Sequence, residues 1–145
     1  GYLQPSLDQF YNAIEMDILH RMCLVCEKNP DLSYLAHQGV LLFNAALTTE
    51  INKAGSHLEL WEPFTKYVIE EILNSAQVPY IFLGKDAAQY AKYANPFSWS
   101  FTTTHPASAS YRNTEWESGD VFKMVNKVLK DNNNFQIEWL DGAPF

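Results

Sequence analysis

The chain has 145 residues, of which 47% are hydrophobic; this suffices for the core of one domain and excludes an intrinsically disordered chain. We expect residues 1–145 to form a single domain. With 17 acidic and 10 basic residues, the net charge of −7 argues against a duplex-binding protein, although a few well-placed donors can outweigh this average. No apolar run approaches the roughly 20 residues of a membrane span, and the start lacks a signal peptide. We therefore expect an intracellular protein, cytoplasmic or nuclear, without membrane association.

The two cysteines, Cys23 and Cys26, fall on the apolar face of a predicted helix together with Met16 and Leu19. We expect reduced cysteines buried in the core, in a reducing compartment. The alternative is a redox pair or, with His20, a metal site, but a closed zinc site needs four ligands and the sequence suggests no fourth. We therefore expect neither a metal nor a cofactor.

Two helical segments precede the first predicted strand. Apolar spacing predicts a helix over residues 6–27, and residues 32–37 are predicted to add one short turn. The run Gly39-Val-Leu-Leu-Phe-Asn-Ala-Ala-Leu-Thr48 then contains four large apolar residues that stop at Asn44. This pattern predicts a buried strand over residues 40–44. Its polar last residue would lie at the carboxyl end, where α/β folds bind ligands.

The middle of the chain alternates a helix and a strand. Residues 48–55 are predicted to be a loop, and Ser56-His-Leu-Glu59 resembles a capping box before a helix over residues 62–75. The predicted buried stripe of that helix is Trp61, Phe64, Val68, Ile69, Ile72 and Leu73. A buried strand over residues 78–83 leads into Gly84-Lys85-Asp86 and a helix over residues 86–93. A glycine between a strand and a helix is typical of an anion site.

The last part of the chain supplies a third strand and a final helix. Alternating aromatic and polar residues predict a strand over residues 97–104, which delivers His105. A polar loop over residues 107–119, a helix over residues 120–130 and an extended tail at residues 137–139 follow. Alternation of this kind indicates a parallel sheet covered by helices. We predict an α/β fold of three layers, α/β/α, around a central parallel sheet with three strands in this chain.

Three strand ends place polar groups at one predicted sheet edge: Asn44, Lys85 and His105. Each alone has an ordinary structural alternative. His105 alone would most often be a packed structural histidine, and Asn44 a turn residue that bonds its own backbone. Lys85 alone would be a solvated charge. Their convergence favours a ligand site over these separate alternatives.

Several ordered motifs resemble uracil-DNA glycosylases. Residues 39–48 resemble the family's uracil-recognition strand, in which Asn is followed by two residues and Leu-Thr. Ser56-His57 with Trp61-Glu-Pro-Phe-Thr65 is similar to the family's Ser-His and Trp-Glu-x-Phe-Thr. Further resemblances are Phe82-Leu-Gly-Lys85, His105-Pro-Ala-Ser-Ala-Ser-Tyr-Arg112 and Ile137-Glu-Trp139. The resemblance covers nearly the whole chain and extends the α/β prediction to the family's four-stranded fold.

The resemblance implies a role for each matching residue. Asn44 would donate its amide NH₂ to uracil O4 and accept from N3–H, whereas cytosine would leave two buried polar groups mismatched at about 1–3 kcal/mol each. His105 would stabilise the negative charge on the departing base, which is worth roughly 3–4 kcal/mol for a preorganised donor. The DNA contacts would come from Lys85, Ser108, Ser110, Tyr111 and Arg112. The uracil nucleotide would first be flipped out of the stack.

The chain departs from the family pattern in two places. The family's Gly-Gln-Asp-Pro-Tyr-His motif, whose Asp positions the attacking water, has no match among residues 1–38. We therefore expect this chain to be the carboxyl-terminal two-thirds of a longer protein. The family's loop also carries a leucine that enters the vacated stack. Here the loop is one residue shorter, Ala109 is the nearest match, and Tyr111 is the alternative.

The sequence predicts a DNA repair glycosylase that hydrolyses the N-glycosidic bond of uracil in DNA, acting as a monomer on uracil-containing DNA. The alternative is a non-catalytic relative that binds DNA or protein. A third possibility is an α/β domain of unrelated function.

Overall fold

The structure, a computed structural model, describes residues 3–22 and 26–142. The chain divides into two compact units. Unit 1 comprises Gly1–Leu41 and Thr103–Phe145, and unit 2 comprises Leu42–Thr102. Within the described residues, no helix combines the length and the apolar character needed to cross a membrane.

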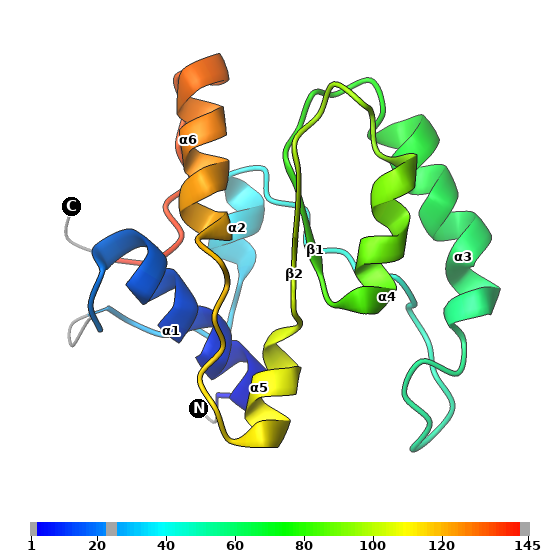
Figure 1. The fold of residues 1–145 in the computed structure, drawn as a ribbon, viewed down its shortest axis with the longest axis horizontal. Helices are drawn as coiled ribbons and strands as arrows, with labels where there is room; N and C mark the ends of the chain where they lie inside the picture. Colours follow the sequence, from blue (N-terminus) through cyan, green and yellow to red (C-terminus); the bar gives the residue numbers. More distant parts are fainter. Residues whose placement is uncertain (1–2, 23–25, 143–145) are drawn as a thin grey trace. The chain divides into compact units, whose positions relative to one another are not determined.

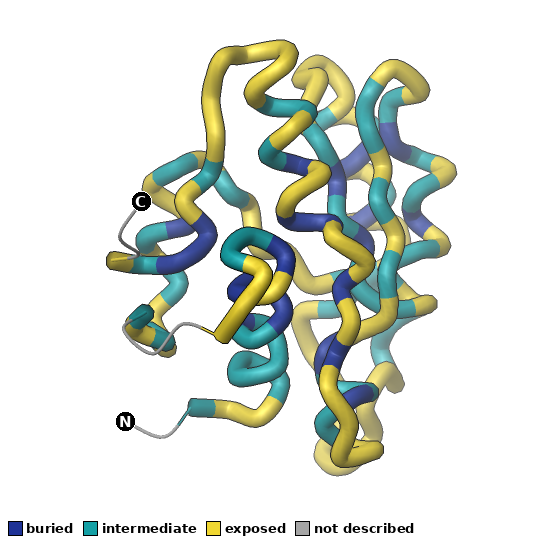
Figure 2. The backbone as a smooth tube through the Cα atoms, turned by 60° about the vertical axis from the view of Figure 1, so that its left-hand side comes forward, coloured by how far each residue is buried: buried dark blue, intermediate teal, exposed yellow. Residues whose placement is uncertain are grey.

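Unit 1 is helical. It contains α1 (Pro5–Leu19), α2 (Ser33–His37), α5 (Pro106–Arg112) and α6 (Val121–Asn133), with α1 packed along α5 and α6 (Figure 1). Proline lies in the first turn of both α1 and α5, where its missing N–H costs no helical hydrogen bond. Each of these helices has both buried and exposed positions (Figure 2), as expected for helices that cover a small core.

Phe122 is the centre of the unit 1 core. It is 1% exposed, and its ring meets three other aromatic rings edge-on, at centroid distances of 5.2 Å to Phe10, 6.2 Å to Trp116 and 5.0 Å to Trp139. Edge-to-face contacts at these distances add about 0.5–1.5 kcal/mol per pair beyond the area they bury. This aromatic cluster links α1, α6, the carboxyl-terminal tail and the segment between α5 and α6.

Unit 2 contains a parallel pair of strands with its helices. α3 (Leu58–Tyr67) continues into the π-helical turn η1 (Val68–Ile72). β1 (Tyr80–Leu83), α4 (Lys85–Ala88) and the 3₁₀ turn η2 (Gln89–Tyr93) lead to β2 (Ser100–Thr103). β1 and β2 form a two-stranded sheet, in which the Tyr80 N–H donates to the carbonyl of Trp99 at 2.8 Å. Because this bond joins the starts of both strands, the pair is parallel and the intervening helices form a crossover.

The core of unit 2 lies between β1 and its crossover. Its buried members are Ile69, Tyr80, Phe82, Tyr90 and Ala94. The rings of Tyr80 and Phe82 are stacked 5.8 Å apart on one face of β1, because residues two apart in a strand point to the same side. The buried strand predicted over residues 78–83 is thus confirmed, with its first two residues outside it.

The first predicted helix is too long. α1 ends at Leu19, because His20 adopts a left-handed conformation with φ of 55° and its N–H donates to the Met16 carbonyl. This geometry turns the chain out of the helix. Cys26 therefore lies beyond the helix, is half-buried and is disulfide-bonded, so its predicted role as a reduced core residue is wrong. The prediction for Cys23 lies outside the described residues.

The strand predicted over residues 40–44 is not formed. These residues have no regular secondary structure, and Leu41, Leu42 and Phe43 are 61%, 51% and 38% exposed. A strand needs backbone hydrogen bonds from a neighbouring strand, and the described sheet contains only β1 and β2. The apolar run therefore has the composition of a buried strand without the pairing that would make it one.

Several other boundaries also shift. The capping box predicted at residues 56–59 is absent, because the Ser56 hydroxyl accepts from the Glu50 N–H at 2.8 Å and α3 begins at Leu58 without a side-chain cap. Pro63 lies inside α3. Val68 and Ile69 of the predicted stripe are buried, whereas Phe64 and Ile72 are 44% and 56% exposed.

The largest change of secondary structure follows His105. Residues 107–119 were expected to be a loop, but α5 occupies the first half of that segment. Pro106 at its first position and the side-chain cap of His105 explain why a polar sequence starts a helix here. The third strand is shorter than the predicted 97–104, since β2 starts at Ser100 and Phe97 is 78% exposed. The last predicted helix is confirmed as α6, which begins one residue later and ends three residues later than predicted.

Candidate functional site

His105 is the amino-terminal cap of α5. Its Nδ1 atom accepts a hydrogen bond from the Ala107 N–H at 3.1 Å, and its ring is exposed. A nitrogen that accepts a hydrogen bond carries no proton. The neutral ring must therefore carry its proton on Nε2, which makes that atom a donor directed away from the helix end. The cap thus fixes both the tautomer and the orientation of the imidazole.

The other predicted contact residues of unit 1 lie along α5 and point in different directions. The Ser108 hydroxyl donates to the His105 carbonyl at 2.7 Å, and Ser110 Oγ is buried without a hydrogen-bond partner among the described residues. Tyr111 is 90% exposed and Arg112 is also exposed. Ala109, the nearest sequence match to the family's inserted leucine, is 6% exposed. In the structure, then, the tyrosine and the arginine present their side chains to solvent.

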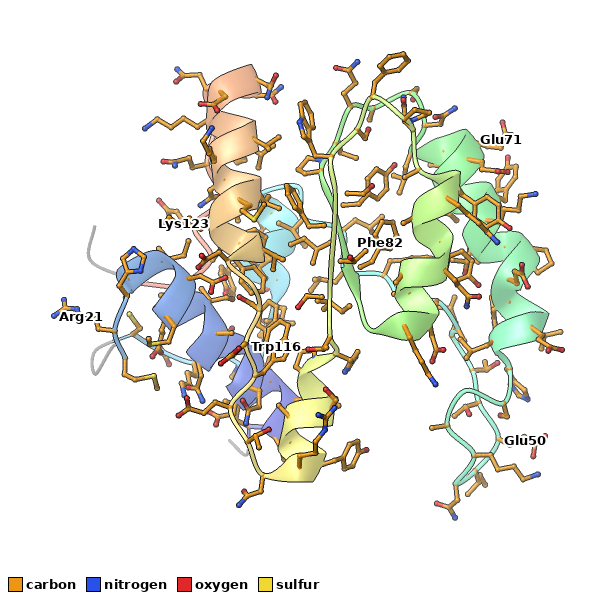
Figure 3. All side chains as sticks on the ribbon, viewed as in Figure 1. Arg21, Glu50, Glu71, Phe82, Trp116 and Lys123 are labelled. Atoms are coloured by element: carbon orange, nitrogen blue, oxygen red, sulfur yellow. The ribbon has the colours of Figure 1, made fainter. Side chains whose placement is uncertain are left out.

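A hydrogen-bonded group behind His105 was not found by the sequence analysis. The Trp116 indole N–H donates to both the carbonyl and the hydroxyl of Thr104, at 3.1 and 3.0 Å. The Trp116 backbone N–H in turn donates to Gln9 Oε1 at 2.8 Å, and Gln9 Nε2 donates to the Thr114 carbonyl at 2.9 Å. Figure 3 labels Trp116 in the segment between α5 and α6. The signal that could have pointed to Trp116 is a single large aromatic residue in an otherwise polar stretch.

Asn44 belongs to unit 2 and is exposed. The next residue is fixed to α3, because the Thr65 hydroxyl donates to the Ala45 carbonyl at 2.9 Å and Thr65 is 2% exposed. On the other side of Asn44, the rings of Phe43 and Phe64 lie 6.2 Å apart. Asn44 therefore lies between two contacts with α3, and these contacts take the place of the sheet pairing predicted for it.

The segment after Asn44 is held by hydroxyl groups. Thr48 Oγ1 accepts from the Trp61 indole N–H at 2.7 Å and lies 2.9 Å from His57 Nδ1. Thr49 Oγ1 donates to the Lys53 carbonyl at 2.6 Å. The motif residues Thr48, His57 and Trp61 thus form one hydrogen-bonded group that anchors the loop to α3.

Lys85 is the first residue of α4 and is exposed. The preceding Gly84 has φ of 87°, a left-handed conformation that glycine adopts without the strain of a side chain. The predicted change from strand to glycine to helix is therefore present, although the α-helix that follows has four residues before it becomes η2.

The three aspartates among residues 1–31 have structural partners. Asp8 pairs with Lys28 at 2.7 Å, and Asp31 accepts from the Ser33 N–H at 2.9 Å. Asp17 is 6% exposed, accepts from the Ser118 hydroxyl at 2.5 Å and also accepts from the Phe122 N–H at the start of α6. Burial raises the pKa of Asp17, and the bond from Ser118 opposes this shift. From the sequence alone, all three aspartates would be surface or cap residues. The Asp31 carboxylate accepts from the N–H of the first residue of α2, as a cap would, whereas Asp17 is buried, so a surface position is wrong for Asp17.

The predicted site residues are divided between the two units. Unit 1 holds His105, Ser108, Ser110, Tyr111 and Arg112 on one short helix and its cap, and unit 2 holds Asn44 and Lys85 on separate segments. No group of three or more His, Cys, Asp or Glu side chains with metal-binding geometry occurs within residues 3–22 and 26–142.

Comparisons with known proteins identify the fold and the family. The family model described as the uracil DNA glycosylase superfamily matches residues 2–130. Uracil-DNA glycosylases from Streptococcus pneumoniae strains, such as Hungary19A-6 and serotype 19F strain G54, are 34% identical over 140 residues, which is 94% of this chain and 61% of theirs. The chain thus spans less than two-thirds of the length of these relatives.

Solved structures give the same result. The crystal structure of mimivirus uracil-DNA glycosylase matches with a TM-score of 0.73 and 25% identity, over 96% of this chain and 56% of that one. A variant of mimivirus UNG in complex with UGI has a TM-score of 0.76 at 24% identity, over 94% of this chain and 56% of the other, and shows the likeness of fold. The predicted α/β class and the resemblance drawn from the motifs are confirmed. The chain belongs to the uracil DNA glycosylase superfamily.

Proposed function

We propose that the protein containing this chain is a DNA repair glycosylase that flips uracil out of DNA and hydrolyses its N-glycosidic bond. Family membership over residues 2–130 supports this proposal. The single observation that carries it is the capped imidazole of His105, whose Nδ1 accepts from the Ala107 N–H and whose Nε2–H is thereby left as a donor. Glycosylic bond cleavage needs such a donor where negative charge develops on the departing base.

In this reaction His105 is the catalytic residue. When the bond between the base and the sugar breaks, its electron pair moves onto the base, largely to O2. The Nε2–H of His105 donates a hydrogen bond to that oxygen and stays on the ring. A donor held in place before the reaction pays no reorganisation cost during it, and removal of one such donor typically costs about 100- to 1,000-fold in rate.

Asn44 is the proposed uracil-specific residue. Its amide supplies one donor for O4 and one acceptor for N3–H, and cytosine presents the opposite pattern at both positions. The hydrogen bond from Thr65 to the Ala45 carbonyl supports this role, because it restrains the backbone beside Asn44. A restrained amide selects a base pattern better than a mobile one, since less ordering is needed on binding.

The proposed DNA contacts are Lys85, Ser108, Ser110, Tyr111 and Arg112. Exposure supports three of them, since Tyr111 and Arg112 reach solvent at the end of α5 and Lys85 is exposed at the start of α4. Tyr111 takes the place of the inserted leucine, because Ala109 is both small and buried. An aromatic ring can stack on the bases left behind when a nucleotide is flipped. Lys85 and Arg112 neutralise phosphates in a protein that is otherwise acidic.

We expect the protein to act as a monomer inside the cell, in a single domain. The second candidate function is a non-catalytic relative that binds DNA. It is favoured by one observation: Asp8, Asp17 and Asp31 are each engaged in structural contacts, so none of them is available to activate water. On the catalytic proposal, the activating carboxylate comes from a strand encoded upstream of Gly1.

The test is release of free uracil from single-stranded DNA by the full-length protein, together with the coding sequence upstream of Gly1. The catalytic proposal predicts release and an Asp-containing strand motif upstream. Binding of uracil-containing DNA without release, and no upstream carboxylate on that strand, would instead support the non-catalytic relative.

A further inference from the structure

We propose that Gln9 and Trp116 are positioning residues that hold the segment carrying His105 in its working geometry. This inference rests on the proposed function of His105, and it concerns residues outside every motif that carried the resemblance. The two side chains make three hydrogen bonds to the residues that flank α5: two from the Trp116 indole to Thr104 and one from the Gln9 amide to Thr114. A fourth hydrogen bond, from the Trp116 backbone N–H to Gln9 Oε1, joins the two anchor residues to each other.

The hydrogen bonds to Thr104 and Thr114 hold the two ends of the segment that carries His105. Thr104 directly precedes His105, and Thr114 follows the left-handed residue Asn113 that closes α5. The bonds therefore fasten both ends of the segment 105–112. α5 has seven residues, and an isolated helix of that length is unstable in water. Its conformation, and with it the cap that orients the His105 ring, must come from tertiary anchors such as these.

The anchor formed by Gln9 and Trp116 is rigid because the Trp116 side chain is buried in the unit 1 core. Trp116 is 5% exposed, and its ring packs edge-on against Phe122 in the unit 1 core. Gln9 lies on α1, which packs along α5. The anchor thus connects the catalytic segment to the core through groups that do not contact the substrate. A displacement of about 1 Å at a reacting group can cost roughly 100-fold in rate, so such an anchor affects the reaction as well as stability.

The chain offers a matched control for each anchor residue. Trp139 is 4% exposed, packs against the same Phe122 ring and donates its indole N–H to the Phe122 carbonyl at 3.2 Å, away from α5. The Gln38 amide donates to the Glu138 carbonyl at 3.0 Å and accepts from the Glu138 N–H at 2.7 Å. In the same way, the Gln9 amide donates to the Thr114 carbonyl and accepts from the Trp116 N–H. Each control residue is of the same type as its anchor residue and is similarly buried. Of the four, Gln9 and Trp116 are the two that bond the residues flanking His105 and α5.

The experiment compares Trp116→Phe with Trp139→Phe, and Gln9→Met with Gln38→Met, in the full-length protein. Because misplacement of a catalytic group lowers the chemical rate, we expect Trp116→Phe and Gln9→Met to reduce kcat for uracil release by about 10-fold or more, with KM within about 2-fold. The two control variants should keep kcat within about 2-fold of wild type at comparable losses of stability. Equal kcat values for an anchor variant and its control would overturn the proposal.

A second readout separates positioning from general damage. If Trp116 acts through His105, Trp116→Phe should lower kcat in the wild-type background and have no further effect in a His105→Ala background. Independent, additive losses would contradict this. Hydrogen exchange supplies a readout without activity: amides of residues 105–112 should exchange at least about 10-fold faster in Trp116→Phe than in Trp139→Phe, as expected for local opening. If the wild type releases no uracil, the proposed function fails, and the exchange result alone decides whether the anchor holds α5.

Discussion

The Nδ1 atom of His105 accepts a hydrogen bond from the N–H of Ala107, 3.1 Å away and two residues further along the chain. One contact therefore does two things: it caps α5 and it assigns the proton of the neutral imidazole to Nε2. A histidine that only packed against the core would not need an exposed ring. The arrangement fits a residue whose second nitrogen is kept available as a donor.

We expect His105→Ala to lower the rate of uracil release at least about 100-fold, because a preorganised donor to the departing base is lost. His105→Asn should retain the cap, since an asparagine oxygen can also accept from the Ala107 N–H. It should nevertheless lose the rate, because its amide cannot place a donor at the Nε2 position. Single-turnover kinetics measures both, and near-wild-type rates for either variant would refute the role.

Asn44→Ala should weaken recognition of uracil without affecting general DNA binding. Loss of one or two base hydrogen bonds is worth about 1–3 kcal/mol each, so we expect kcat/KM for uracil to fall at least roughly 10-fold. The measurement compares uracil release with the affinity for undamaged DNA of the same length. An equal loss in both would show that the variant is disturbed as a whole and that Asn44 has no specific role.

Tyr111→Ala should reduce activity on duplex DNA more than on single strands. Stacking of an aromatic ring on a base is worth about 1–3 kcal/mol, and only a duplex has a vacated stack to fill, so the expected difference is roughly 10-fold. Tyr67, which is 56% exposed on α3, provides the matched control. Tyr67→Ala should leave the ratio of the two activities unchanged, whereas an equal ratio in Tyr111→Ala and wild type would exclude the inserted ring.

Two aspartates should give opposite pH dependences of stability. Burial raises the pKa of Asp17, so the folded state keeps this proton longer, and its contribution to stability falls as pH rises from 3.8 through the raised value. Backbone and side-chain hydrogen bonds from Ser33 lower the pKa of Asp31, so its contribution is present above 3.8 and is lost as pH falls through the lowered value.

Urea unfolding of the full-length protein between pH 3 and pH 7 measures both effects. Asp17→Asn should remove the loss of stability on raising the pH and be more stable than wild type at neutral pH. Asp31→Asn should be less stable than wild type at neutral pH and lose less on acidification. The difference in unfolding free energy between variant and wild type should therefore change with pH in opposite directions for the two substitutions. Changes in the same direction would contradict these assignments.

Much of the fold was predictable because helix spacing and strand composition are local properties. The short helix at residues 33–37, β1 with Phe82 at its centre, and α6 with Val121, Phe122 and Val125 all follow from patterns within one segment. The failures required information from outside the segment. The apolar run at residues 40–43 lacks a neighbouring strand, and the Ser56 hydroxyl bonds the Glu50 backbone in place of its own helix.

The candidate site shows the same division. Asn44, Lys85 and His105 could be proposed from the order of motifs, since each follows a recognisable pattern. The cap geometry of His105 and the contacts of Gln9 with residues more than a hundred positions away could not. Hydrogen bonds across that separation in the chain depend on how α1 packs against α5, which no local pattern specifies.

The most direct test of the central claim is a single-turnover assay of the full-length protein and its His105→Ala variant, on single-stranded oligonucleotides that contain one uracil, cytosine or thymine at the same position. We predict release of free base from the uracil substrate alone, and a rate at least about 100-fold lower for the variant. Absence of uracil release by the wild-type protein, or equal rates for the two proteins, would contradict it.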